Sequence, residues 1–194
     1  MLAANSFNSS GYKRQQGLTL IELMVTLLVF TLLVSVGAPS LSTMLERTDA
    51  SADFDKVITS ISAARTLAIS TSIPHTLCPL DNSLQCQRSW NEQLTLFADY
   101  NRNQILDGND WAVQIVPAAD ASVLRDYPRN AISFRSTGAA GGYNGSFSYC
   151  RKGLQNDTYG NVAIISLQGR IRRGADSNNN GLPETADGKD IPCN

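Results

Sequence analysis

The sequence predicts an α+β fold in which one long N-terminal helix packs on an antiparallel β-sheet domain. Two features of the 194-residue chain lead to this prediction. Apolar residues form one uninterrupted run near the N-terminus, and the second half of the chain alternates short apolar segments with turns rich in Gly, Asn and Asp. A long helix must bury its apolar face against another element, and short strands with frequent turns supply a sheet for it.

The apolar run extends from Leu18 to Ala38 and contains one charged residue, Glu22. As a helix rising about 1.5 Å per residue, it would span roughly 30 Å, which matches the hydrocarbon core of a bilayer. We therefore predict a transmembrane helix over residues 18–38. The basic pair Lys13 and Arg14 precedes the run, so we expect the N-terminus to stay in the cytoplasm and the rest to be exported.

The helix is expected to continue in amphipathic form over residues 39–73. Apolar residues recur there at helical spacing, with polar residues between them. They are Phe54, Val57, Ile58, Ile61, Ala64 and Ala68. Pro74 predicts that the helix ends near Ser72, because the residue before a proline disfavours helical geometry.

The remaining segment, 74–194, is predicted to form short strands separated by turns. The predicted strands are His75–Leu80, Gln93–Ala98, Ala112–Val116, Ala131–Arg135, Ser146–Arg151, Asn161–Leu167 and Arg170–Arg173. Four cysteines lie in this segment, and in an exported domain they predict two disulfides. Of the three pairings we favour Cys78 with Cys86, which closes a short loop, and Cys150 with Cys193, which would fix the C-terminus.

A motif at the start of the apolar run carries a family resemblance. Gly17-Leu18-Thr19-Leu20-Ile21-Glu22 resembles the class III signal of type IV prepilins and type II secretion pseudopilins, although the family usually has Phe where this chain has Leu18. The resemblance implies that residues 1–17 are a leader that a prepilin peptidase removes, and that the new N-terminus, Leu18, is methylated. It implies that Glu22 pairs with the Leu18 amine of a neighbouring subunit, and that Pro39 kinks the helix. The alternative is a plain membrane anchor.

The later sequence resembles the GspH/FimT family of minor pilins and pseudopilins. The resemblance rests on Leu96–Asn103, on Ile132-Ser133-Phe134 followed by Gly138, and on Asn161–Ser166 running into Gly169. It implies a pilin fold in a single-pass inner-membrane protein whose C-terminal domain is periplasmic. It also implies assembly with other pilins into a pilus or pseudopilus. His75 is the single histidine and has no evident catalytic partner, so an enzyme is not expected.

A basic run after the last long predicted strand is the strongest candidate for a binding site. In Gly169-Arg170-Ile171-Arg172-Arg173, strand alternation would place Arg170 and Arg172 on one face about 7 Å apart, a spacing that suits successive DNA phosphates. The run resembles the Gly-Arg-x-Arg motif of FimT, a minor pilin of this family implicated in DNA binding during natural transformation. We expect double-stranded DNA as the ligand, with Arg173 as a third cation and with Arg151 and Lys152 extending the patch.

The charge pattern of the chain bears on the prediction of DNA binding, and a structural explanation of the arginines is the alternative to it. The formal net charge of −1 gives no sign of a nucleic-acid partner, but eight basic and three acidic residues lie between Trp111 and Ala175. The alternative is that the arginines are a solvated sheet edge. The chain would then be a structural type II secretion pseudopilin or a pilus-priming minor pilin.

Two turns rich in Asp and Asn match the ligand spacing of a calcium loop. The first contains Asp176, Asn178, Asn180, Glu184 and Asp187, with Gly181 at its sixth position. The second and poorer match contains Asp99, Asn101, Asn103, Asp107 and Asp110, with Gln104 in place of the glycine. The alternative is that both are ordinary polar turns, which Asn and Asp favour. Calcium is thus the cofactor that the sequence suggests, in a loop that would either stiffen the arginine site or screen it.

Overall fold

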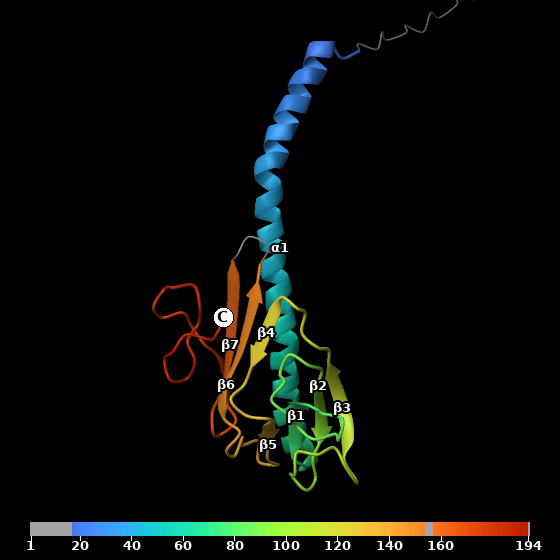
Figure 1. The fold of residues 1–194 in the computed structure, drawn as a ribbon, viewed down its shortest axis with the longest axis vertical. Helices are drawn as coiled ribbons and strands as arrows, with labels where there is room; N and C mark the ends of the chain where they lie inside the picture. Colours follow the sequence, from blue (N-terminus) through green and yellow to red (C-terminus); the bar gives the residue numbers. More distant parts are fainter. Residues whose placement is uncertain (1–16, 154–156, 194) are drawn as a thin grey trace, which may run out of the picture. The chain divides into compact units, whose positions relative to one another are not determined.

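The computed structural model describes residues 17–153 and 157–193, except the side chains of residues 36–40 and 43. These residues form one long helix and eight strands (Figure 1). The chain divides into two units, Met1–Ser42 and Thr43–Asn194, and helix α1 (Leu20–Thr71) contributes to both. The predicted leader lies outside the described residues apart from Gly17.

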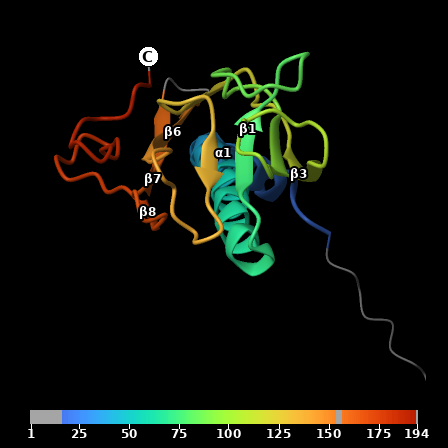
Figure 2. The ribbon, with the colours of Figure 1, turned by 90° about the horizontal axis from the view of Figure 1, so that it is seen from below.

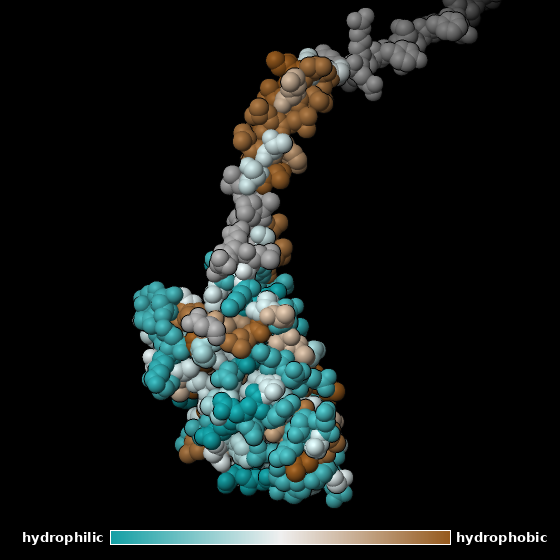
Figure 3. All heavy atoms as spheres, in the orientation of Figure 1, coloured by the Kyte–Doolittle hydropathy of each residue, from teal (hydrophilic) through white to brown (hydrophobic). Residues whose placement is uncertain are grey.

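In the first unit, the described residues are mostly α1, which exposes large apolar side chains along its length. Its large apolar side chains from Leu18 to Val34 are between 47% and 78% exposed, and they form the brown surface in Figure 3. The hydroxyls of Thr26, Thr31 and Ser35 donate hydrogen bonds to carbonyl oxygens of the preceding helical turn at 2.8 to 2.9 Å. These three hydroxyls are therefore satisfied within the helix.

Among the described residues, the structure contains no helix of the length and hydropathy needed to cross a membrane. The predicted membrane segment 18–38 extends into residues whose side chains lie outside the description. The membrane assignment therefore stays a prediction, as does the kink at Pro39. The backbone is helical through that position.

In the second unit, α1 buries the face that the apolar spacing predicted. Phe54, Val57, Ile61, Ala64 and Ala68 are fully buried and belong to one core cluster. The helix ends at Thr71, close to the predicted end, because Pro74 follows. Burial of this face positions both sheets of the domain.

The predicted antiparallel domain consists of two four-stranded sheets. The first has the order β3 (Trp111–Val116), β2 (Leu94–Ala98), β1 (His75–Pro79) and β5 (Ile132–Phe134). The second has the order β4 (Val123–Asp126), β6 (Gly145–Lys152), β7 (Thr158–Ile165) and β8 (Ile171–Arg173). Figure 2 shows α1 between β1 and β3 on one side and β6, β7 and β8 on the other.

Strand β4 was missed by the sequence reading, because two of its four residues are charged. Its Arg125 is buried in the core-facing side of the sheet, where it meets Asp53 of α1. Arg125 Nη2 donates to both carboxylate oxygens of Asp53 at 2.9 and 3.1 Å, and Nη1 donates to the Pro117 carbonyl at 3.0 Å. The ion pair makes a charged residue compatible with a buried strand position.

The first sheet is joined to the same helix by a neutral contact. Gln114 of β3 donates from Nε2 to the hydroxyl of the buried Ser60 at 3.0 Å. Trp90 fills the core between the sheets, where its ring meets Tyr127 and Phe147 at centroid distances of 5.4 and 5.8 Å. A polar contact therefore ties the first sheet to α1, and aromatic packing around Trp90 fills the shared core.

Both predicted disulfides are present, and each closes a small core on the outer face of one sheet. Cys78–Cys86 packs with Phe97 and Ala131 on the first sheet. Cys150–Cys193 packs with Val162, Ile164 and Ile191 on the second sheet. The second disulfide thus holds the C-terminal segment against β6 and β7.

The Asp53–Arg125 pair gives a first test. We expect Asp53→Ala to lower the free energy of unfolding by about 3 kcal/mol, because it leaves a buried guanidinium without its counterion. The matched control is Asp55→Ala, which breaks the exposed pair of Asp55 with Arg173 and should cost less than about 1 kcal/mol. Chemical denaturation of the oxidised full chain in detergent measures both, and equal losses would contradict the assignment.

Candidate functional site

The predicted basic run begins in the tight turn that joins β7 to β8. Ser166 N–H donates to the Arg170 carbonyl at 2.9 Å, Gly169 N–H donates to the Ser166 carbonyl at 2.8 Å, and Arg170 N–H donates to the Ser166 hydroxyl at 3.0 Å. Gly169 has a φ of +79°, in the left-handed region that favours glycine. The turn is therefore fixed by its own hydrogen bonds before any ligand arrives.

Gly169 is also required because another backbone passes directly beside it. A Cβ atom at this position would lie 1.9 Å from the carbonyl oxygen of Gly138, a distance that no real contact allows. That oxygen accepts a hydrogen bond from Arg65 Nε of α1 at 3.1 Å. The turn, the loop after β5 and the helix thus meet at one junction, which we call the Gly138–Gly169 junction.

The three arginines of the run do not all lie on one face of the sheet. In the β7–β8 pairing, Arg172 lies opposite Ile164 of the outer cluster, whereas Arg173 lies opposite Ala163 of the main core. Arg173 pairs with Asp55 and lies over the Phe54 ring at 5.4 Å. Strand alternation therefore turns Arg173 toward α1, away from the face of Arg172, and its role as a third cation stays a prediction.

Arg151 and Lys152 do not extend the patch. They lie opposite Tyr159 and Thr158 at the start of β7, whereas Arg172 lies opposite Ile164 near its end. The distance from Tyr159 to Ile164 is roughly 17 Å along an extended strand. The sequence could not show this, because antiparallel pairing places the end of β6 beside the beginning of β7.

Arg170 and Arg172 remain as an exposed pair. Both are exposed, and within the described residues neither guanidinium has a hydrogen bond or ion pair. Arg172 borders a shallow crevice that Glu184 also lines. Glu184 is nearly buried, and its carboxylate accepts the N–H groups of Ser177 and Asn178 at 2.8 and 3.1 Å. Its charge is therefore engaged with the backbone of the C-terminal loop.

The first predicted calcium loop is only partly assembled. Asp176 accepts the N–H groups of Asn180 and Gly181 at 3.1 and 2.8 Å, and the amides of Asn178 and Asn180 both donate to Asp190. Glu184 caps the backbone instead of joining this group. Asp187 accepts from Thr185 and pairs with Lys189, and the hydrogen bond from Thr185 lowers its pKa.

Asp190 was not predicted as part of this loop, because it lies after the last position of the expected ligand spacing, Asp187. Its side chain reaches the loop because the segment folds back, with a bridge between Glu184 and Asp190. Within the described ranges, no group of three or more His, Cys, Asp or Glu side chains is arranged to hold a metal.

The second loop repeats the first in its hydrogen bonds. Asp99 accepts the N–H groups of Asn103 and Gln104 at 3.1 and 3.3 Å, and the amides of Asn101 and Asn103 donate to Asp107. Gln104 has a φ of +62° where Gly181 has +90°, so the missing glycine does not prevent the turn.

The ends of the second loop are held by the first sheet. Asp99 is fully buried, which raises its pKa, and it accepts a hydrogen bond from Thr76 at 2.8 Å. Asp110 accepts the N–H of Tyr100 at 2.9 Å, and the Tyr100 ring lies 5.5 Å from that of Trp111. These contacts anchor the loop to β1 and β3.

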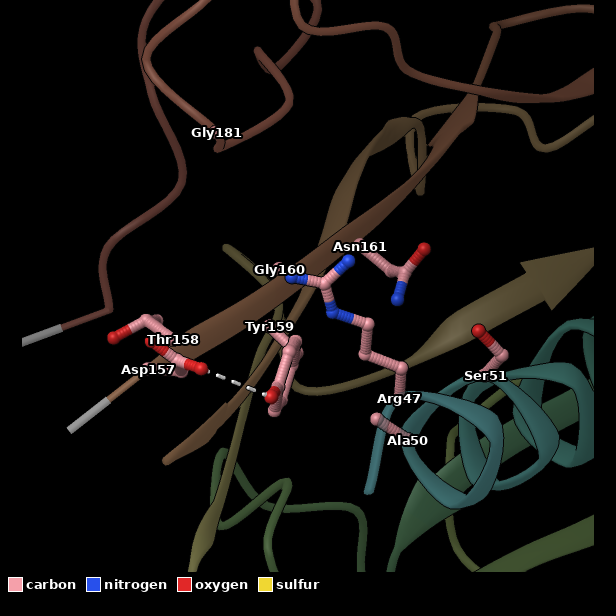
Figure 4. A pocket seen from close by; sticks show the side chains of 9 residues that line it. All are labelled: Arg47, Ala50, Ser51, Asp157, Thr158, Tyr159, Gly160, Asn161 and Gly181. Carbon is pink, nitrogen blue, oxygen red and sulfur yellow. Dashed lines mark hydrogen bonds between the residues drawn. The ribbon is translucent and has the colours of Figure 1, made fainter. Parts of the chain in front are cut away.

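A buried histidine and a polar pocket are two further candidates for catalytic chemistry. His75 is buried in β1, and its Nδ1 lies 2.8 Å from the Ile73 carbonyl, which is a structural contact. A polar pocket lies between α1 and the start of β7 (Figure 4). There Arg47 lies over the Tyr159 ring at 5.5 Å, and Tyr159 donates to Asp157 at 3.3 Å. Neither feature brings a nucleophile and a base together.

The processing motif lies at the start of α1. Thr19 caps the helix, because its hydroxyl accepts the N–H of Glu22 at 3.3 Å. Glu22 thus occupies the first turn, where a carboxylate interacts favourably with the helix dipole. A Cβ atom at Gly17 would meet no atom within 4 Å, and Gly17 is not among the residues with positive φ. The fold described here does not require glycine at that position.

Comparison with known proteins gives two family matches. The model of the type II transport protein GspH matches residues 54–169, and that of the prokaryotic N-terminal methylation motif matches residues 12–38. The GspH match ends at Gly169, before the exposed arginines. No curated protein matches the chain.

One solved structure is similar to this chain, the type IV minor pilin FimU of Pseudomonas aeruginosa. It aligns with a TM-score of 0.50 and 17% identity over 66% of this chain and 90% of that chain. At this identity the likeness shows the fold, a helix packed on antiparallel sheets.

Calcium binding stays a prediction and can be tested by metal removal. We expect calcium at about a hundred times its Kd to raise the unfolding free energy by about 2.7 kcal/mol, and a chelator to reverse the gain. Asp176→Ala should abolish this shift, whereas Asp187→Ala should preserve it, because Asp187 is engaged by Thr185 and Lys189. Thermal unfolding of the full chain measures the shift, and identical melting in calcium and chelator would refute the prediction.

Proposed function

The chain is a pilin-like protein of the GspH family, and from this premise we propose that it enters a type IV pilus and binds double-stranded DNA there. One observation carries the DNA-binding proposal. Arg170 and Arg172 are exposed on a hairpin that is fixed at the Gly138–Gly169 junction, and neither has an ion-pair partner in the described part of the chain.

The proposed binding acts through DNA phosphates. A guanidinium offers a planar set of donors that matches a phosphate group, and two of them on one hairpin, Arg170 in the turn and Arg172 in β8, suit successive phosphates. Because the turn is held by backbone hydrogen bonds, little ordering of the protein is needed on binding. Binding of this kind is independent of base sequence and weakens steeply with salt, because each neutralised phosphate releases counterions.

The N-terminal motif supports a role as a processed and assembled subunit. We propose that prepilin peptidase cuts between Gly17 and Leu18, and that the chain waits in the inner membrane with its C-terminal domain in the periplasm. The helix from Leu18 to Val34 exposes apolar side chains all round, which suits both lipid and the packed helices of a filament. In that surrounding, the Glu22 carboxylate needs a cationic partner, which the Leu18 amine of a neighbouring subunit would supply.

A structural role without DNA binding is the second candidate. The family model that matches is that of a type II transport protein, and its match stops before Arg170. In this case the chain would be a minor pseudopilin, or a minor pilin that primes assembly. Its arginines would then keep the sheet edge at β8 solvated.

If Glu22 pairs with the Leu18 amine of a neighbouring subunit, its removal should impair filament assembly without impairing membrane insertion of the protein. Glu22→Ala should insert into the inner membrane normally, because it removes a charge from an apolar segment, yet enter filaments poorly. Immunoblots of membrane and sheared-filament fractions measure the two steps. Glu46→Ala, outside the apolar run, is the control. Normal recovery of Glu22→Ala in filaments would refute the pairing.

DNA binding is tested with the full chain in non-ionic detergent and a fluorescent duplex at several salt concentrations. Wild-type binding should weaken as salt rises. In the Arg170→Ala/Arg172→Ala variant, the slope of log affinity against log salt concentration should be smaller in magnitude by about two. Arg151→Ala/Lys152→Ala removes the same charge elsewhere and should change binding little. If the wild-type protein does not bind DNA at low salt, the DNA-binding proposal is refuted and the structural role is the one that stands.

A further inference from the structure

Two more guanidiniums converge on the β7–β8 turn from elements that are distant in sequence. We propose that Arg65 of α1 and Arg135, which follows β5, form a single DNA-binding surface with Arg170 and Arg172. This inference rests on the proposed function, and it names residues and a surface for the same ligand. Local sequence patterns do not indicate this surface, because Arg65 lies 105 residues before Arg170 in the chain and Arg135 lies 35 residues before it.

Arg65 is held at the turn by a contact with its neighbouring loop. Its Nε donates to the Gly138 carbonyl at 3.1 Å, and the same Nε lies 3.1 Å from the Cβ position of Gly169. Arg170 is the next residue in the chain. The bond to Gly138 uses one N–H group of Arg65, and the guanidinium keeps four more donors for a ligand.

Arg135 reaches the same place through the loop that follows it. The Cβ position of Gly141 lies 2.5 Å from Arg135 Nε, so the exposed Arg135 side chain runs across Gly141. The N–H groups of Ala140 and Gly141 donate to the Leu167 carbonyl in the β7–β8 turn at 3.1 and 3.4 Å. Arg135 is therefore attached to the turn by backbone hydrogen bonds.

The surroundings of these four arginines favour a polyanion. Residues 62–72, 135–145 and 166–174, which form the junction, contain no Asp or Glu. Glu184 lines the crevice beside Arg172, but its carboxylate is engaged by the N–H groups of Ser177 and Asn178. The nearest acid before Arg65 on α1 is Asp55, about 15 Å away along the helix, and it is paired with Arg173. Ser136, Thr137 and Gln168 are exposed in these same segments and offer uncharged donors. Clustered cations with neutral donors are the groups that contact a DNA backbone.

The surface is tested by removing one charge at a time from the full chain in detergent. We expect Arg65→Gln and Arg135→Gln each to weaken binding to a fluorescent duplex several-fold and to lower the salt slope by about one. Lys152→Gln and Arg102→Gln remove one charge each from exposed sites elsewhere and should leave the slope unchanged. Arg65→Lys keeps the charge without the Nε–H group, so near-normal binding by this variant would assign the effect to charge.

The outcomes separate this inference from the proposed function. If Arg170→Ala/Arg172→Ala abolishes binding while Arg65→Gln and Arg135→Gln bind as wild type, the wider surface is refuted and the arginine pair stands. An equal loss in Lys152→Gln would also refute it, since any lost charge would then suffice. Wild-type protein that does not bind DNA refutes both. Melting temperatures of all variants exclude unfolding as the cause of a loss.

Discussion

The domain depends on one shared face of α1, because both sheets pack on it and no strand pairing joins the two sheets within the described residues. Alanines at positions 50, 64 and 68 let the strands approach this face closely, while Phe54 and Ile61 fill the space between. Polar contacts then fix each sheet: Gln114 to Ser60 for the first, and Arg173 to Asp55 and Arg125 to Asp53 for the second. Because the buried Arg125 guanidinium donates to Asp53 of α1 and to the Pro117 carbonyl, this contact also fixes the position of β4 along the helix.

The outer faces of the sheets follow a common plan. Each carries a disulfide, a small apolar cluster and an Asp-Asn turn with the same internal hydrogen bonds. On the first sheet the turn begins at the buried Asp99, and on the second it begins at Asp176 in the C-terminal segment. Short polar turns of this kind satisfy their own backbone groups, so they can cover a sheet without a further strand.

Much of the fold followed from local patterns, whereas the site depended on pairing. Helical spacing predicted that Phe54 and Ile61 are buried, because this pattern repeats within a few residues. The order of the four cysteines along the chain led to the prediction of both disulfides. Strand β4 escaped because Arg125 is neutralised by a residue of α1 far away in sequence. Arg172 and Arg173 were correctly placed in a strand, whereas Arg170 lies in the turn before it. The partners of Arg172 and Arg173, Ile164 and Ala163, and hence their two faces, are set by a register that the sequence does not state.

The placement of the two tryptophans gives the chain a pair of optical probes. Trp90 is 1% exposed, donates to the Arg129 carbonyl at 2.9 Å and is surrounded by aromatic rings of the shared core. Trp111 is 45% exposed and begins β3. Its ring lies against that of Tyr100, which belongs to the second Asp-Asn turn. Their fluorescence therefore separates by emission wavelength and by access to an aqueous quencher: the blue-shifted component reports the core, and the quenchable component reports the surface loop.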